Sequence, residues 1–200
     1  MITIPVHSYY KSLSTMTLCV DIYCGPYLSI FSLSLTHSFS SELSPPSLRI
    51  MSTVVLITGA NRGLGYGLLE RYLKLPNHTV VAANRNPDHP TSKGLSKLPT
   101  AEGTKLVVVK LDARVWQDAF DAVKTLEFQG INHLDIVIAN AGVAYCWPTV
   151  AEVKLEDLVA HVEPNAYGVV SLYQAVRPLL QKSKKEPMYS IMGTTAGSLK

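Results

Sequence analysis

A glycine-rich turn between an apolar strand and a helix is the feature that most constrains this chain. The segment "TVVLITGANRGLG", Thr53–Gly65, begins with the β-branched and aliphatic residues of a buried parallel strand. Gly59, Gly63 and Gly65 then allow the backbone to turn sharply and to approach a ligand closely. The following helix directs free N–H groups and its positive dipole end at the turn, which suits a pyrophosphate. The segment predicts a dinucleotide site, with a plain tight turn as the alternative.

Strands and helices alternate along the rest of the chain. Apolar runs predict five strands, and helical spacing of apolar residues predicts the helices between them. Such alternation predicts an α/β fold, a doubly wound parallel sheet of Rossmann type with right-handed crossovers. The predicted strands are Thr53–Thr58, His78–Ala83, Lys105–Leu111, His133–Asn140 and Pro187–Gly193. The predicted helices are Leu64–Leu75, Thr91–Leu98, Val115–Gln129 and Val153–Ser183, the last interrupted at Pro164.

The composition changes at about residue 50. Residues 1–50 are rich in serine and short of charge, and the stretch "SSELSPPSLR" near their end is typical of a linker. The apolar run Leu18–Leu35 lacks a basic start and is broken by Asp21, so it is a poor signal peptide. We expect residues 1–50 to be a poorly ordered extension or sequence ahead of a start at Met51, with a targeting or anchoring arm as the alternative. Residues 51–200 are expected to form the nucleotide-binding domain.

Composition and charge argue against several classes of function. An apolar content of 47% and a charged content of 16% are typical of a globular domain with a sizeable core. The net charge of +3 is scattered without a basic stripe, which argues against nucleic-acid binding. No run approaches the length of a membrane span without a charge or a proline. Cys19, Cys24 and Cys146 form neither a disulfide framework nor a zinc motif, which favours a reducing, cytoplasmic location.

Four further motifs follow the glycine turn in order. They are Asp112 after the third predicted strand, "ANAG" (Ala139–Gly142) after the fourth, Asn165 in the long helix, and "GTTAG" (Gly193–Gly197) after the fifth strand. Together with the turn, which reads T-G-x-x-x-G-x-G, they resemble the short-chain dehydrogenase/reductase family. The resemblance covers Thr53–Lys200. The sequence departs from the family's N-N-A-G pattern at Ala139, which replaces the first asparagine.

The identity of the cofactor follows from the charge after the second strand. NAD-selective sites carry an acid there for the ribose 2′-hydroxyl, whereas an arginine suits a 2′-phosphate. This chain has "AANRNP" with Arg85, and Arg62 in the glycine turn can reach the same phosphate. We therefore expect NADP(H), with a merely solvated Arg85 as the alternative; the resemblance adds Asp112 against the adenine. The predicted cofactor-binding residues are Gly59, Asn61, Arg62, Gly63, Leu64, Gly65, Arg85, Asp112, Asn140 and Gly142.

Carbonyl reduction by hydride needs a proton donor and a hydroxyl that orients the oxygen. The resemblance implies that Thr194 supplies the hydroxyl, with Thr195 and Ser198 as alternatives, and that Asn165 supports the proton path. It places the donor in a Tyr-x-x-x-Lys pair more than a dozen residues beyond Thr194, whereas the chain ends after six. We expect an NADPH-dependent ketoreductase, an oxidoreductase that is incomplete at its C-terminus. The alternative is a catalytically inactive NADP-binding fragment.

Few residues bear on the substrate. The segment "VAYCWP" (Val143–Pro148) is expected at the pocket entrance, where Trp147 would stack on a planar substrate; a core tryptophan is the alternative. "AANRNP" and the Met192–Gly193 pair look most like fungal-type ketoreductases of the norsolorinic acid reductase group, which implies an aromatic or polyketide ketone as the small-molecule partner. The resemblance implies that a helix beyond Lys200 packs against the long helix, so one apolar face of the long helix is expected to lie partly uncovered, which favours association or aggregation. That face comprises Val169, Leu172, Val176 and Leu179. A homo-oligomer is expected for a full-length form.

Overall fold

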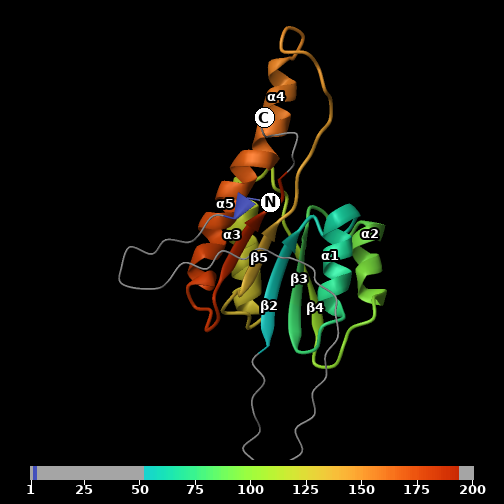
Figure 1. The fold of residues 1–200 in the computed structure, drawn as a ribbon, viewed down its shortest axis with the longest axis vertical. Helices are drawn as coiled ribbons and strands as arrows, with labels where there is room; N and C mark the ends of the chain where they lie inside the picture. The colour runs from blue at the N-terminus through green and yellow to red at the C-terminus, as the bar shows by residue number, and fades with distance from the viewer. Residues whose placement is uncertain (1, 4–51, 194–200) are drawn as a thin grey trace, which may run out of the picture. The chain divides into compact units, whose positions relative to one another are not determined.

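One sheet organises the structure, which is a computed structural model that describes residues 2–3 and 52–193. The sheet has six strands in the order β1-β6-β5-β2-β3-β4 (Figure 1). Strands β2 to β6 pair in parallel, and β1 pairs antiparallel with β6. This arrangement confirms the predicted Rossmann-type sheet of five parallel strands and adds β1. The strands are β1 (Ile2–Thr3), β2 (Thr53–Thr58), β3 (His78–Asn84), β4 (Lys105–Lys110), β5 (Ile136–Ala139) and β6 (Met188–Ile191).

Helices cover both faces of the sheet. In Figure 1, α1 and α2 lie on one side of the strands, and α3 and α5 lie on the other. None of the helices described here is both long and apolar enough to cross a membrane. The α-helices are α1 (Gly63–Leu73), α2 (Pro90–Lys93), α3 (Trp116–Phe128), α4 (Leu155–Val162) and α5 (Gly168–Leu180). A 3₁₀ turn, η1 (Gly94–Lys97), follows α2, and a π-helical turn, η2 (Glu163–Tyr167), joins α4 to α5.

Alternate side chains along a central strand point to opposite faces of the sheet and pack in different hydrophobic clusters. In β2, Val55 and Ile57 pack in a cluster with Leu69 of α1. Val54 and Leu56 pack in a second cluster with residues of α3 and α5. A strand buried on both faces is apolar at every position, which is why the run "TVVLIT" predicts β2 to the residue.

The long helical region is divided into three parts. The sequence predicts one helix over Val153–Ser183 with an interruption at Pro164, and the structure places α4, the π-helical turn η2 and α5 there. Proline lacks a backbone N–H, so it removes one helical hydrogen bond and favours a local irregularity. The interruption therefore appears as the one wider turn, η2, and the helical region continues beyond it as α5.

One expectation about α5 is wrong. The face expected to lie partly uncovered is largely buried, because it packs in the same cluster as α3 and the sheet. Leu172, Val176 and Leu179 are almost inaccessible to solvent, and Val169 is half-buried. The apolar residues that α5 and the preceding turn do expose are Val170 and Tyr167. Helical spacing identified an apolar face correctly, but it carried no information on which neighbour covers that face.

A buried carboxylate ties β5 to its neighbours. Asp135 precedes β5, and its side chain accepts hydrogen bonds from the Val54 N–H at 2.8 Å and from the Ser183 hydroxyl at 2.5 Å. Its own backbone N–H donates to the Val54 carbonyl at 2.9 Å, and its carbonyl accepts from Met188 at 2.8 Å. One residue thus aligns the start of β5 with β2 on one side and β6 on the other. The strand β5 begins at Ile136, directly after Asp135, and not at the predicted His133.

Replacement of this carboxylate is expected to destabilise the fold strongly. Asp135→Ala leaves the Val54 N–H without its acceptor. It leaves the Ser183 hydroxyl with the longer bond to the Lys185 carbonyl at 3.2 Å. Loss of hydrogen bonds to a charged group costs about 2–3 kcal/mol of unfolding free energy. Urea unfolding followed by circular dichroism measures the change. The matched control is Glu70→Ala, which removes an exposed ion pair with Lys74 and should change stability by less than about 0.5 kcal/mol. Equal effects of the two substitutions would contradict this role of Asp135.

Candidate functional site

The glycine turn starts where β2 ends. Gly59 and Gly63 have φ angles of 63° and 56°, a region that residues with a Cβ rarely adopt. The Gly59 N–H donates to the Ala83 carbonyl at 2.8 Å, and the Ala60 N–H donates to the Asn84 side chain at 2.9 Å. The turn is thereby fastened to the end of β3 before α1 begins.

Gly65 lies at the closest approach within the site. A Cβ on Gly65 would overlap the carbonyl oxygen of Gly59 and would come within 2.5 Å of the Asn140 side-chain nitrogen. That nitrogen donates to the Thr58 carbonyl at 2.9 Å and to the Gly59 carbonyl at 3.3 Å. Asn140 therefore closes the turn from the β5 side. Of the predicted cofactor residues, Gly59, Gly65 and Asn140 are brought into direct proximity.

The first turn of α1 is open to an anion. Its N-cap, Arg62, is extended and makes no side-chain capping bond, and the first turn carries no acidic residue. Leu64 is 72% exposed and Arg62 is also exposed. The N–H groups at a helix start need partners and carry partial positive charge, so an uncapped start suits phosphate oxygens.

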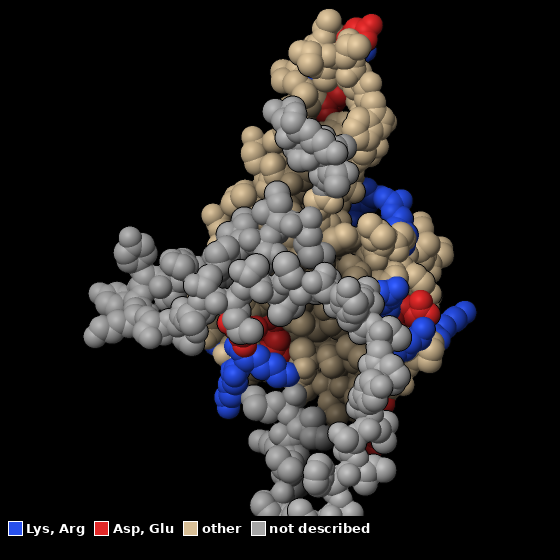
Figure 2. Space-filling view, viewed as in Figure 1, with Lys and Arg blue, Asp and Glu red and all other residues tan. Residues whose placement is uncertain are grey.

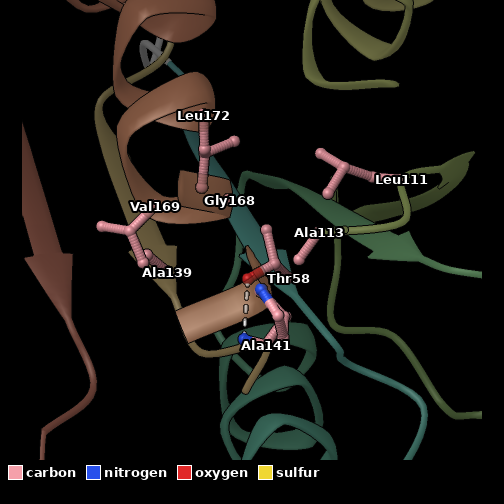
Figure 3. Close-up of a pocket in the computed structure, with 9 residues that line it drawn as sticks. Thr58, Leu111, Ala113, Ala139, Ala141, Gly168, Val169 and Leu172 are labelled. Carbon is pink, nitrogen blue, oxygen red and sulfur yellow. Dashed lines mark hydrogen bonds between the residues drawn. The ribbon is translucent and has the colours of Figure 1, made fainter. Parts of the chain in front are cut away.

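The Thr58 hydroxyl is a part of the site that sequence reasoning missed. Its Oγ1 accepts a hydrogen bond from the Asn140 N–H at 3.0 Å. It accepts a second from the Ala141 N–H at 2.9 Å (Figure 3). The side chain is buried. It joins the C-terminal ends of β2 and β5 and sets the course of the backbone through "ANAG". The signal was available, because Thr58 is the first letter of T-G-x-x-x-G-x-G.

Two arginines border the glycine turn. Arg85 follows β3, and both Arg85 and Arg62 are exposed. Within the described residues, no carboxylate forms a salt bridge with either of them. Asn61, also predicted to bind the cofactor, donates from its side chain to the Thr91 hydroxyl of α2 at 2.6 Å. The two guanidinium groups are thus available to an anionic ligand. The Asn61 side chain instead links the glycine turn to α2.

The carboxylate of Asp112 is held by Arg114. Its Oδ1 accepts from the backbone N–H of Arg114 at 3.1 Å and from Nε at 3.2 Å, and its Oδ2 accepts from Nη2 at 2.8 Å. Burial raises the pKa of Asp112, but the hydrogen bonds and charge of Arg114, with a further contribution from Arg85, lower this pKa below its ordinary value. The group is therefore an anion that pairs with Arg114 and interacts electrostatically with Arg85.

Asp118 positions the Asp112 segment and was also missed. Its buried carboxylate accepts from the Asp112 backbone N–H at 2.8 Å and pairs with Lys110 at 2.6 Å. These bonds tie the segment after β4 to α3. No sequence signal separates Asp118 from an ordinary acid in the first turn of a helix, because its partners come from the strand and not from its own helix.

Asn165 holds the loop that follows "ANAG". Its Oδ1 accepts from the Val143 N–H at 2.8 Å, and its Nδ2 donates to the Val143 carbonyl at 2.8 Å. A Cβ on Gly142 would lie 3.1 Å from the same Oδ1, which is a tight approach. The π-helical turn η2 thus presents Asn165 to the backbone of the β5–α4 loop. Thr194, its predicted catalytic partner, lies outside the described residues.

A mostly apolar pocket opens between these elements. It lies between Thr58 at the end of β2, the segment after β4 and the start of α5 (Figure 3). Gly168 allows this arrangement, since a Cβ there would overlap the carbonyl oxygen of Ala113. The residues lining the pocket are Thr58, Leu111, Ala113, Ala139, Ala141, Pro164, Gly168, Val169 and Leu172.

The β5–α4 loop and α4 form an apolar surface beside the site. Figure 2 shows few Lys, Arg, Asp or Glu atoms on the face of this region that is in view. Trp147 is 84% exposed, so the alternative of a core tryptophan is wrong. The exposed apolar residues of this surface are Tyr145, Trp147, Val150, Leu155, Leu158, Val159 and Val162.

A family model decides the relationship of this chain to known proteins. The model, described as short chain dehydrogenase, matches residues 53–187, which include the glycine turn, Asn140 and Asn165. The chain belongs to the short-chain dehydrogenase family. Norsolorinic acid ketoreductase of Aspergillus parasiticus is 42% identical over 148 residues, covering 74% of this chain and 54% of that protein. A norsolorinic acid ketoreductase of Dothistroma septosporum is 43% identical over 132 residues, covering 66% and 49%.

Solved structures of the family share the fold. NADPH-bound carbonyl reductase from chicken fatty liver superposes with a TM-score of 0.58 at 30% identity, covering 67% of this chain and 50% of that one. The 3-ketoacyl-(acyl-carrier-protein) reductase of Brucella melitensis, complexed with NADH, gives a TM-score of 0.56 at 26% identity, covering 66% and 52%. The chain spans about half the length of these structures and of the curated relatives above.

Two glycines of α1 provide a sharp test of the turn. Gly65→Ala forces a Cβ onto the Gly59 carbonyl and should lower the unfolding free energy by about 1–3 kcal/mol. Gly67→Ala, two residues further along the same helix, meets nothing within 4 Å and should raise it by about 0.5–1 kcal/mol. Thermal unfolding of both variants gives the comparison. A Gly65→Ala protein as stable as the parent would show that the close approach is absent.

Proposed function

We propose that this protein is an NADPH-dependent ketoreductase whose substrate is an aromatic or polyketide ketone. Membership of the short-chain dehydrogenase family carries the proposal. Its support in the molecule is the cradle in which Gly65, the Gly59 carbonyl and Asn140 meet in front of an uncapped helix. The names of the relatives, norsolorinic acid ketoreductases, support reduction of a ketone.

The cradle fits a dinucleotide. The backbone at Gly65 has no room for a side chain, and the adjoining first turn of α1 offers unpaired N–H groups to a pyrophosphate. The "ANAG" backbone, fixed by the Thr58 hydroxyl, leads from the pyrophosphate towards the loop held by Asn165. The residues proposed to hold the cofactor are Gly59, Asn61, Arg62, Gly63, Leu64, Gly65, Arg85, Asp112, Asn140 and Gly142.

Charge supports NADPH over NADH. Arg85 and Arg62 are exposed at the rim where the adenosine ribose would lie, and a guanidinium binds phosphate oxygens in a bidentate way. Asp88 is the nearest acid after β3, and it forms a salt bridge with Lys93 at 3.2 Å. It is therefore engaged away from Arg85. We assign the 2′-phosphate to Arg85, with Arg62 as its second partner.

The bound nicotinamide would supply the hydride, and the tyrosine of the Tyr-x-x-x-Lys pair that the resemblance implies beyond Thr194 would supply the proton. Asn165 would support the proton path at the helix irregularity, and Thr194 would direct its hydroxyl at the substrate carbonyl so that the oxygen accepts a hydrogen bond as negative charge develops. The exposed rings of Tyr145 and Trp147 lie on the loop that Asn165 holds, and they offer flat faces to a planar substrate.

Exchange of the charge at Arg85 tests the choice of cofactor. Arg85→Asp should weaken NADPH binding about 10- to 100-fold and weaken NADH binding little or not at all, because a charge-assisted contact to the 2′-phosphate is replaced by repulsion. Titration of nicotinamide fluorescence measures both dissociation constants. Arg177→Asp, the same charge change on the exposed side of α5, is the control and should leave both constants unchanged. An unaltered preference in Arg85→Asp would remove the phosphate assignment.

The reductase activity is tested, in a protein that extends through the Tyr-x-x-x-Lys pair implied by the resemblance, by NADPH oxidation in the presence of an aromatic or polyketide ketone. Thr194→Ser keeps the orienting hydroxyl and should retain most of the rate, whereas Thr194→Ala should lower it by about 100-fold. Tight NADPH binding without any ketone-dependent oxidation would contradict the ketoreductase and support an NADP-binding protein without turnover.

A further inference from the structure

His161 is bound between the β5–α4 loop and its own helix. Its Nε2 accepts a hydrogen bond from the Tyr145 backbone N–H at 2.9 Å. Its Nδ1 lies 2.6 Å from the Asp157 carbonyl oxygen. The Tyr145 ring meets the imidazole edge-on, with ring centroids 5.4 Å apart and planes at 69°. The imidazole is half-buried by these contacts.

The contacts define the protonation state of the ring. A backbone N–H can only donate, so Nε2 must offer a lone pair to Tyr145. A carbonyl oxygen can only accept, so Nδ1 must carry the proton. These two conditions together describe neutral imidazole in a single tautomer. The protonated ring would place a second N–H against the Tyr145 N–H and would lose that bond.

His161 and Asn165 together hold two alternate residues of the loop. They lie one helical turn apart, and their side chains accept from the N–H groups of Tyr145 and Val143. No residue of α4 is buried, so apolar packing does little to fix this region. Within the described part of the chain, residues 144–148 of the loop form one hydrogen bond to another residue, and the Tyr145 N–H is its donor.

We propose that His161 is a positioning residue that holds the Tyr145–Trp147 segment of the loop in place only while its imidazole is neutral. The role at a substrate rests on the function proposed above, whereas the contact with the loop does not. Since Val143 is held by an amide that does not titrate, the loop keeps its attachment next to "ANAG" when His161 is protonated. The part that carries the two exposed aromatic rings is then released.

Both ring nitrogens of His161 are bound to the backbone. Among the described residues, the Tyr145 phenol is the titratable group that contacts the ring, and Asp157 contributes its backbone carbonyl. Arg114 pairs with Asp112 and interacts electrostatically with Tyr145 and Glu163. The lost hydrogen bond is therefore not replaced by an ion pair at either ring nitrogen.

Hydrogen exchange of two loop amides in the full chain tests the proposal. The protein is labelled with ¹⁵N-valine and ¹⁵N-tyrosine, and Val143→Ile and Tyr145→Phe assign the two signals. Protection of the Tyr145 amide, corrected for intrinsic exchange, should fall about fivefold between about pH 8 and about pH 5, the range in which histidine titrates. Protection of the Val143 amide should stay within about twofold, because its acceptor is an amide oxygen.

The matched variant is His161→Gln, whose side-chain carbonyl can accept from Tyr145 at every pH. Its Tyr145 protection should be the same at both pH values, and circular dichroism checks that the fold is retained. Unchanged protection in the parent protein, or an equal fall in His161→Gln, would overturn the proposal. The experiment uses neither NADPH nor a ketone, so failure of the ketoreductase assay does not affect its outcome.

Discussion

The meeting of Gly65, the Gly59 carbonyl and Asn140 is the constraint on which the rest of the site depends. Without a side chain at Gly65, α1 can begin directly against the end of β2, and its N-terminus faces the space above the sheet. Asn140 fills the remaining gap and uses its amide to satisfy two carbonyl oxygens that the turn leaves free. The arrangement combines a residue without a side chain on α1 with an amide side chain after β5.

The ends of the parallel strands then follow from satisfied backbone groups. Three loops leave the same edge of the sheet, and each exposes N–H groups that lack ladder partners. Thr58 satisfies two of them after β5, Asn84 satisfies one in the glycine turn, and Asp118 satisfies one after β4. Polar side chains that belong to no recognisable sequence motif of their own therefore fix the course of the backbone in these three loops.

The sequence predicted the strands well because burial on both faces leaves a pattern that needs no tertiary information. The runs at Thr53 and His78 give β2 and β3 to within a residue. It predicted the residues of the turn for a similar reason, since glycine and its spacing encode local backbone geometry. It failed where the partner is distant in the chain. Asp118 and His161 have the local appearance of solvated helix residues, and only the folded structure supplies the backbone groups that they bind. The burial of Val176 was mispredicted for the same reason, because its covering residues come from α3.

The site is built in two physically different ways. At the glycine turn and the start of "ANAG", Thr58 and Asn84 are buried, so their hydrogen bonds are protected from competing water. On the loop side, Asn165 is exposed and His161 half-buried, and both bind a loop beside a helix that contributes no buried side chain. A hydrogen bond that water can replace contributes less to stability than a buried one. The glycine turn should therefore keep its shape under conditions in which the loop opens.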